Sequence, residues 1–116
     1  MAQEPDLQPA PVQLTLQRSG SGSHPIVEAV GEIDVATSPL LRAELAALLE
    51  QAPESITVDL AAVSFIDSSG LGVLVGALKG LRDQNPAADM RVLHPQDAVR
   101  KVFDITGLDD LFDLRA

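Results

Sequence analysis

The sequence SFIDSSGLGVLVG, residues 64–76, indicates an apolar strand followed directly by a helix. Its first residues are typical of a strand inside a sheet, and apolar side chains recur with helical spacing after the two serines. Asp67 and Ser68 are both residue types that cap helix N-termini. We therefore expect a strand to end just before Asp67, and a helix to run from about residue 69 to residue 83, before an Asn-Pro pair.

Strand and helix patterns also flank this segment. They predict two strands first, over residues 12–17 and 24–34, and then a helix that a hydroxyl caps at 37–39 and that ends before 51–53. A strand over 56–60, whose apolar run continues into a turn, precedes the helix over 69–83. A strand over 90–94, a helix over 96–105 and a last short amphipathic helical piece over 108–114 complete the chain. Strands separated by helices require right-handed crossovers and parallel pairing, whereas the opening hairpin adds an antiparallel strand. The sequence therefore predicts an α/β fold, a four-stranded mixed β-sheet with helices packed on it.

The length of 116 residues fits one compact domain and is too short for two. Residues 1–11 contain three prolines and few large apolar side chains, so we expect a flexible tail there and the domain over 12–116. The net charge is −9, from 8 basic and 17 acidic residues. This charge argues against direct binding to nucleic acid or to an anionic membrane surface, because both partners require basic patches.

The residue types present exclude several further classes. There is no cysteine, which excludes disulfide scaffolds, thiolate nucleophiles and cysteine-based metal sites. The two histidines, His24 and His94, have no paired spacing, so we expect no metal site and no cofactor. No basic segment precedes an apolar run at the start, and no apolar stretch is long enough for a membrane span. We therefore expect a cytoplasmic protein.

Ser69 is the residue that we expect to carry chemistry. It falls in the first turn of the predicted helix, where free backbone N–H groups and the positive end of the helix dipole favour a nearby anion. The site is therefore suited to carry a phosphate on Ser69 or to hold one that arrives. The alternative is an ordinary helix cap with no further role, which is the common use of an Asp-Ser-Ser sequence.

Asp34 closes the predicted second strand just before a helix, as Asp67 closes a later one. Strand ends that precede helices meet at one edge of a parallel sheet, so these two acids are expected near each other, beside Ser69. The alternative for Asp34 is an acidic turn residue in solvent.

The predicted helix is unusually rich in glycine. Gly72, Gly76 and Gly80 are spaced by four and share one face, although each interior glycine costs about 0.5–1 kcal/mol relative to alanine. Two explanations remain open: close packing of this face on a neighbouring element, or a flat surface on which a partner protein docks.

Three blocks of this sequence resemble the anti-sigma factor antagonists, the small single-domain members of the STAS superfamily. They are Gly31-Glu32-Ile33-Asp34 with Leu40, Leu41 and Leu45, the hexapeptide Asp67-Ser68-Ser69-Gly70-Leu71-Gly72, and Phe103 to Leu108 with Phe112. In this order they cover about residues 12–114, nearly the whole chain.

The resemblance implies a regulatory protein of bacterial transcription rather than an enzyme. Such a protein binds an anti-sigma factor that is also a serine kinase and so frees a sigma factor. Phosphorylation by the kinase releases the antagonist, and a phosphatase resets it. Carried over by position, the phosphorylated residue is Ser69, and the partner-binding residues are Asp34, Asp67, Ser68, Gly70, Leu71 and Gly72. We expect a monomer.

Two rival functions remain. One is a STAS domain that is never phosphorylated and serves as an accessory or scaffold domain of a transporter or signalling complex; the acceptor Ser69 argues against it. The other is a small hydrolase that uses Ser69 as its nucleophile, which requires a base within hydrogen-bond reach. Neither histidine has a motif that places it there.

Overall fold

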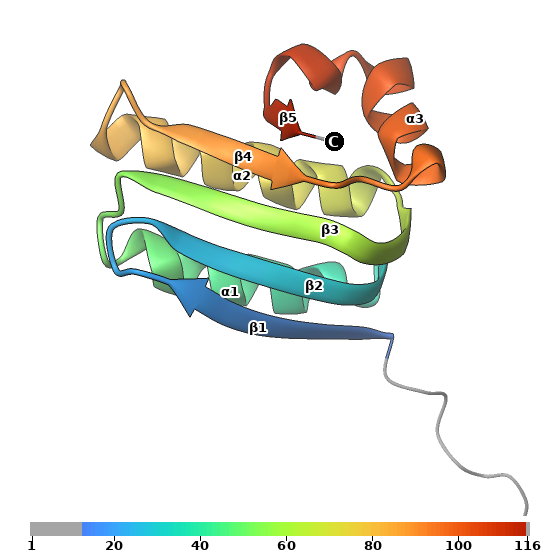
Figure 1. Cartoon of the computed structure of the whole chain (residues 1–116), viewed down its shortest axis with the longest axis horizontal. Coiled ribbons are helices and arrows are strands. Elements are labelled where there is room, and N and C mark those ends of the chain that lie inside the picture. Colours follow the sequence, from blue (N-terminus) through green and yellow to red (C-terminus); the bar gives the residue numbers. More distant parts are fainter. Residues whose placement is uncertain (1–12, 116) are drawn as a thin grey trace, which may run out of the picture.

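The computed structural model describes residues 13–115 of the chain (Figure 1). The tail predicted for residues 1–11 lies outside the described residues. The elements are β1 (Leu14–Gly20), β2 (Pro25–Ile33), α1 (Ser38–Leu49), β3 (Ser55–Ile66), α2 (Ser68–Gln84), β4 (Asp89–Leu93), α3 (Asp97–Thr106), the 3-10 turn η1 (Leu108–Asp110) and β5 (Asp113–Arg115). The helices predicted over 69–83 and 96–105 are confirmed to within one residue at each end.

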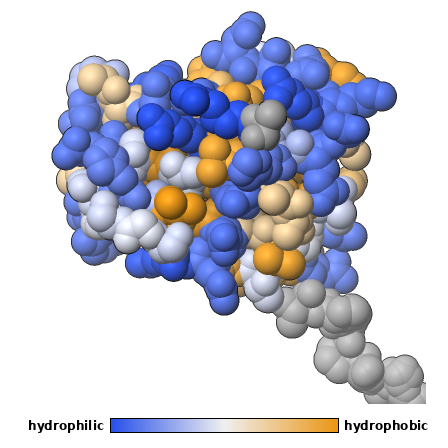
Figure 2. Space-filling view, viewed as in Figure 1, coloured by the Kyte–Doolittle hydropathy of each residue, from blue (hydrophilic) through white to orange (hydrophobic). Residues whose placement is uncertain are grey.

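The strands form one mixed sheet in the order β1-β2-β3-β4-β5. β1 pairs antiparallel with β2, and every later pair is parallel, as the sequence predicts for an opening hairpin followed by crossovers. Figure 1 shows α1 and α2 behind the sheet on one face, and α3 beyond the end of β4. The opposite face, seen in Figure 2, carries mostly hydrophilic residues around small groups of hydrophobic ones.

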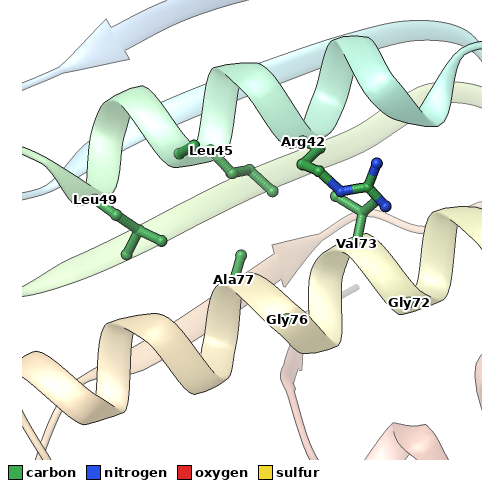
Figure 3. Close-up of a pocket in the computed structure, with 8 residues that line it drawn as sticks. Arg42, Leu45, Leu49, Gly72, Val73, Gly76 and Ala77 are labelled. Carbon is green, nitrogen blue, oxygen red and sulfur yellow. The ribbon is translucent and has the colours of Figure 1, made fainter.

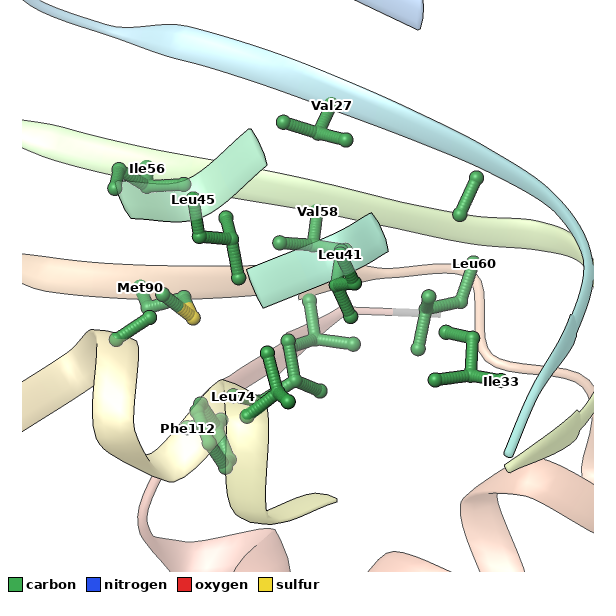
Figure 4. Packing of buried hydrophobic residues seen from close by; sticks show 14 of the residues in the cluster. Val27, Ile33, Leu41, Leu45, Ile56, Val58, Leu60, Leu74, Met90 and Phe112 are labelled. Atoms are coloured by element: carbon green, nitrogen blue, oxygen red, sulfur yellow. The ribbon is translucent and has the colours of Figure 1, made fainter. Parts of the chain in front are cut away.

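The core lies between the sheet and the two helices that cover it. Alternate strand residues such as Val27, Val58 and Met90 point toward the helices, where Leu45 of α1 and Leu74 of α2 meet them (Figure 4). All five side chains are buried. Burying a side chain of this size contributes about 1.5–3 kcal/mol to the free energy of unfolding. This apolar layer therefore stabilises the sheet whose strand ends carry the candidate site.

The C-terminal piece differs from its prediction. The sheet has five strands rather than four, because residues 113–115 pair with β4 instead of completing a helix. Asp113 binds Arg91 of β4 across this pairing, with 3.4 Å between Arg91 Nε and Asp113 Oδ2. Phe112 packs edge-on against Phe103, with 5.8 Å between ring centroids. Three residues are too few to show a strand period, so only these long-range contacts reveal β5.

β3 is also longer than its alternating pattern predicts, since residues 61–66 form a strand and not a turn. Its pairing with β2 shifts register between Glu28 and Val30 and again between Gly31 and Glu32. Each shift breaks the two-residue alternation from which a strand is recognised. Gly31 has φ +123°, and a Cβ there would lie 2.0 Å from the carbonyl oxygen of Gln13, so glycine is required at this bulge.

Candidate functional site

The ends of β2 and β3 lie side by side at one edge of the sheet. Ile33 and Ile66, the last residues of the two strands, are register partners. The N–H of Asp67 also donates to the Ile33 carbonyl at 3.1 Å. Asp34 and Asp67 therefore follow paired residues at a single edge, Asp34 in the turn before α1 and Asp67 directly before α2. This is the neighbourhood that the parallel-sheet argument predicts.

Asp67 is the N-cap of α2. Its Oδ1 accepts hydrogen bonds from the N–H groups of Ser69 at 2.9 Å and Gly70 at 3.2 Å. The predicted cap is thus confirmed for Asp67, while Ser68 is the first residue of the helix. One consequence corrects the sequence argument: the N–H groups of Ser69 and Gly70 already bind a carboxylate and are not free to hold a phosphate.

Asp34 organises the turn between β2 and α1. Its carboxylate accepts from the N–H groups of Ala36 at 2.9 Å and Thr37 at 3.0 Å. The Thr37 hydroxyl donates to the Glu32 carbonyl at 2.8 Å and accepts from the Asp34 N–H at 2.9 Å. The expected hydroxyl cap on α1 is therefore wrong, since this buried hydroxyl is used inside the turn. Asp34 is likewise more than a solvated acid, because it fixes the turn beside Asp67.

The two serines differ in accessibility. Ser68 is exposed and Ser69 is half-buried on the first turn of α2. Within residues 13–115, the Ser69 hydroxyl forms no hydrogen bond, so its oxygen is free to react or to bind. Asp67 holds the backbone of Ser69 in place through the cap.

Gly70 and Leu71 belong to the interior of the protein. A Cβ at Gly70 would lie 2.5 Å from Cγ2 of Ile33 and 2.8 Å from Cγ1 of Ile66. Leu71 is buried in the core. These two residues seat α2 against the ends of β2 and β3, next to Ser68 and Ser69, and their predicted contact with a partner stays a prediction.

Gly72 and Gly76 are exposed, and a Cβ at either would meet no atom within 4 Å. Together with Val73 they border a shallow groove of about 240 Å³ between α2 and α1, whose opposite wall includes Leu45 and Leu49 (Figure 3). Close packing therefore does not explain these two glycines. It does apply to Gly80, where a Cβ would lie 3.0 Å from Leu49 Cδ1.

Three exposed apolar residues lie at the same edge of the sheet. Val35 in the β2–α1 turn is 73% exposed, Leu40 in the first turn of α1 is 53% exposed, and Phe65 near the end of β3 is 46% exposed. Exposed apolar side chains at a sheet edge that also carries polar groups are typical of a protein interface. The apolar pattern of the sequence could not identify these residues, because it does not distinguish buried from exposed positions.

The histidines have no hydrogen bond or ion pair with Ser69 within residues 13–115. His24 precedes β2, at the opposite end of that strand from Asp34; its Nδ1 is 2.8 Å from Ser55 Oγ, and its Nε2 is 3.9 Å from Glu54 Oε1. His94 follows β4. Within residues 13–115 there is no group of three or more side chains that could hold a metal ion. Nor is any helix in that part of the chain long and apolar enough to cross a membrane.

Comparison with known proteins agrees with this geometry. A model of the STAS domain family matches residues 15–116. The anti-sigma-B factor antagonist of Bacillus subtilis (strain 168) is 40% identical over 90 residues, which are 78% of this chain and 80% of that protein.

Solved structures show the same similarity. An anti-sigma factor antagonist from Mycobacterium paratuberculosis has a TM-score of 0.80 at 30% identity, over 91% of this chain and 88% of its own. The antagonist SpoIIAA in its unphosphorylated form has a TM-score of 0.76 at 28% identity, over 88% of each chain. The phosphorylated Bacillus SpoIIAA has a TM-score of 0.67 at 26% identity, over 88% of this chain and 91% of its own.

Proposed function

The chain belongs to the STAS domain family, and we propose that it is an anti-sigma factor antagonist whose binding to an anti-sigma factor ends when Ser69 is phosphorylated. The anti-sigma factor is also the kinase. It transfers the γ-phosphoryl group of ATP to the Ser69 oxygen, the hydroxyl proton leaves, and ADP is released. A phosphatase removes the phosphate and restores the binding form. The antagonist itself catalyses nothing and acts as a cytoplasmic monomer.

One observation carries this proposal: the Ser69 hydroxyl, unbonded within residues 13–115, stands at the edge of the sheet where exposed apolar residues also follow or begin neighbouring elements. The Asp67 cap and the close seat of Gly70 hold this part of the chain in place. Val35, Leu40 and Phe65 supply the apolar area that a protein partner covers. A free hydroxyl in such a surface is both accessible to a kinase and sensitive to modification.

Phosphorylation acts against binding through charge. A phosphate adds about −1.5 to −2 charges at neutral pH. It would stand beside Asp67 and Asp34, whose carboxylates already occupy this edge. A partner that covers the unmodified hydroxyl would have to desolvate this charge with no group prepared to receive it, which lowers affinity directly. The partner-binding residues under this proposal are Asp34, Asp67, Ser68 and Gly72, with Gly70 and Leu71 supporting them from inside.

The test combines phosphorylation with binding. The full chain is incubated with ATP and the anti-sigma kinase of its own cell, and the phosphate is mapped by peptide mass spectrometry. We expect one phosphate on Ser69, which is lost in Ser69→Ala and kept in the matched control Ser68→Ala. Ser69→Asp should weaken binding to the same anti-sigma factor by about tenfold or more, roughly 1.4 kcal/mol.

Phosphate on Ser68 alone would contradict the assignment of the site. If no cognate kinase transfers phosphate and Ser69→Ala behaves as wild type in cells, the protein is instead an unphosphorylated STAS scaffold.

A further inference from the structure

Among the described residues, no carboxylate pairs with Arg42. It is exposed on the second turn of α1, and no ion pair among residues 13–115 includes it. Four other arginines do bind acidic side chains: Arg18, Arg82, Arg91 and Arg115. In a chain with 17 acidic and only 8 basic residues, a free arginine is available for an anion from outside the unmodified protein.

Arg42 lies next to the helix face that carries Ser69. It lines the groove together with Gly72 and Val73 of α2, and Figure 3 shows its guanidinium reaching over Val73 toward the N-terminal end of that helix. Side chains in a helix lean toward its N-terminus, which explains this direction. Ser69 precedes Gly72 and Val73 by three and four residues, so it lies on the same face, about 5–6 Å further toward the N-terminus.

The immediate surroundings of Ser69 offer a phosphate little else. The N–H groups of Ser69 and Gly70 are bound to the Asp67 carboxylate, and that carboxylate repels a second anion. Gly72 places no side chain between the two helices, and the space beside it is open. A guanidinium presents two parallel N–H donors that match phosphate oxygens.

We propose that Arg42 binds the phosphate of phosphorylated Ser69 across the groove between α1 and α2, an inference that rests on the proposed function of Ser69. The contact stabilises the dianionic phosphate against the two neighbouring acids. It also withdraws an exposed cation from the groove, so that the phosphorylated form presents a different surface to a partner.

The experiment measures the phosphate directly. Phosphoserine is inserted at position 69 during synthesis of the full chain, so that no kinase is needed, and its ³¹P resonance is titrated against pH. Removing a bound cation disfavours the dianion. We therefore expect Arg42→Gln to raise the second pKa of the phosphate by about 0.3–0.7 unit, and Arg42→Lys to raise it by less.

Lys79→Gln is the matched control. It removes the same charge from an exposed position on α2, but ten residues, or about 15 Å along the helix, separate it from Ser69, beyond the screening length of about 8–10 Å. We expect it to leave the phosphate pKa unchanged. The melting temperatures of the unphosphorylated variants confirm that each one folds, as expected for exposed side chains.

Equal phosphate pKa values in the wild type and Arg42→Gln would overturn the proposal, and so would an equal shift in Lys79→Gln, which would indicate only a general field. The proposed function can fail separately. A pKa shift specific to Arg42 with no binding to any anti-sigma factor supports the phosphate contact and rejects that function. Phosphate-dependent release of the anti-sigma factor with no pKa shift rejects the contact alone.

Discussion

At the scale of single residues, two glycines that are two positions apart in α2 have opposite surroundings. Gly70 lies against the side chains of Ile33 and Ile66, and the space beside Gly72 is open. Both glycines belong to the same hexapeptide, yet the fold requires Gly70, whereas Gly72 lies open at the surface. The difference comes from where a Cβ would point, which is toward the strand ends at Gly70 and away from them at Gly72.

Alanine at these two positions should therefore have opposite effects on the free energy of unfolding. Gly70→Ala forces a Cβ to within 2.5 Å of Ile33 Cγ2 and should destabilise the protein by about 1–3 kcal/mol. Gly72→Ala gains helix propensity with no clash and should stabilise it by about 0.5–1 kcal/mol. Urea unfolding of both variants measures this. If both variants changed the free energy of unfolding in the same direction, Gly70 would not pack closely against the strand ends.

At the scale of elements, the groove between α1 and α2 offers an explanation for the four-residue spacing of glycines in α2. Gly76 borders the groove, with open space where a side chain would stand. The groove begins one turn after Ser69, so a partner that covers the serine can extend along it. This favours docking over close packing as the reason for Gly72 and Gly76, while Gly80 packs against Leu49.

Gly76→Leu fills the groove without disturbing the core. We expect the melting temperature to stay the same or rise, because leucine has a higher helix propensity than glycine. We expect affinity for the anti-sigma factor to fall at least tenfold, measured by calorimetry. The control is Ala43→Leu, an exposed position of α1 outside the groove lining. Unchanged affinity in a folded Gly76→Leu variant would reject docking in the groove.

β5 pairs with β4 through its backbone, and the Asp113 carboxylate adds an ion pair with Arg91 of β4. Arg115 donates to Asp113 at 2.7 and 3.0 Å and, helped by Arg91, holds the pKa of that carboxyl below its ordinary value. A lowered pKa means that this contribution to stability is present at neutral pH and is lost as the pH falls through the folded-state pKa. Through the Arg91 pair, which joins β5 to β4, acid should therefore loosen β5 slightly.

Hydrogen exchange of the β5 amides tests this expectation. We expect Asp113→Asn at neutral pH to speed their exchange about two- to fivefold, as for loss of an exposed ion pair. The matched control is Asp89→Asn, which removes the pair with Arg82 instead. Equal protection of β5 in the wild type and Asp113→Asn would show that the apolar contacts of Phe112 hold the strand without the carboxylate.

At the scale of the whole molecule, we expect phosphorylation of Ser69 to leave the fold in place. The antagonist SpoIIAA has been solved in unphosphorylated and phosphorylated forms, and both are similar to this chain over 88% of its length. Repulsion between two unit charges about 4 Å apart costs about 1–4 kcal/mol, depending on the effective dielectric constant. The opposing helix-end attraction is about 0.3–1 kcal/mol, and a domain of this kind is stable by roughly 5–15 kcal/mol.

Phosphorylation of Ser69 should consequently lower the melting temperature without unfolding the protein at 25 °C. Differential scanning calorimetry of the two forms should show a cooperative transition in each. Ser68 offers a control, since phosphoserine inserted there adds the same charge one residue away. A phosphorylated form with no unfolding transition would mean that release occurs by unfolding and not at the surface.

Much of the fold and of the candidate site could be predicted from the local sequence. Apolar periodicity located α2 and α3, the Asp67 carboxylate and the left-handed Gly107 marked helix ends, and three sequence blocks, the hexapeptide among them, indicated the family. These features depend on residues within a turn or two of one another. The pairing of β5, the bulged extension of β3, the inward seat of Gly70 and Leu71, and the position of Arg42 beside the face of Ser69 could not be predicted in this way. Each depends on contact between segments far apart in the chain, and such contacts exist only once the sheet and its helices have packed.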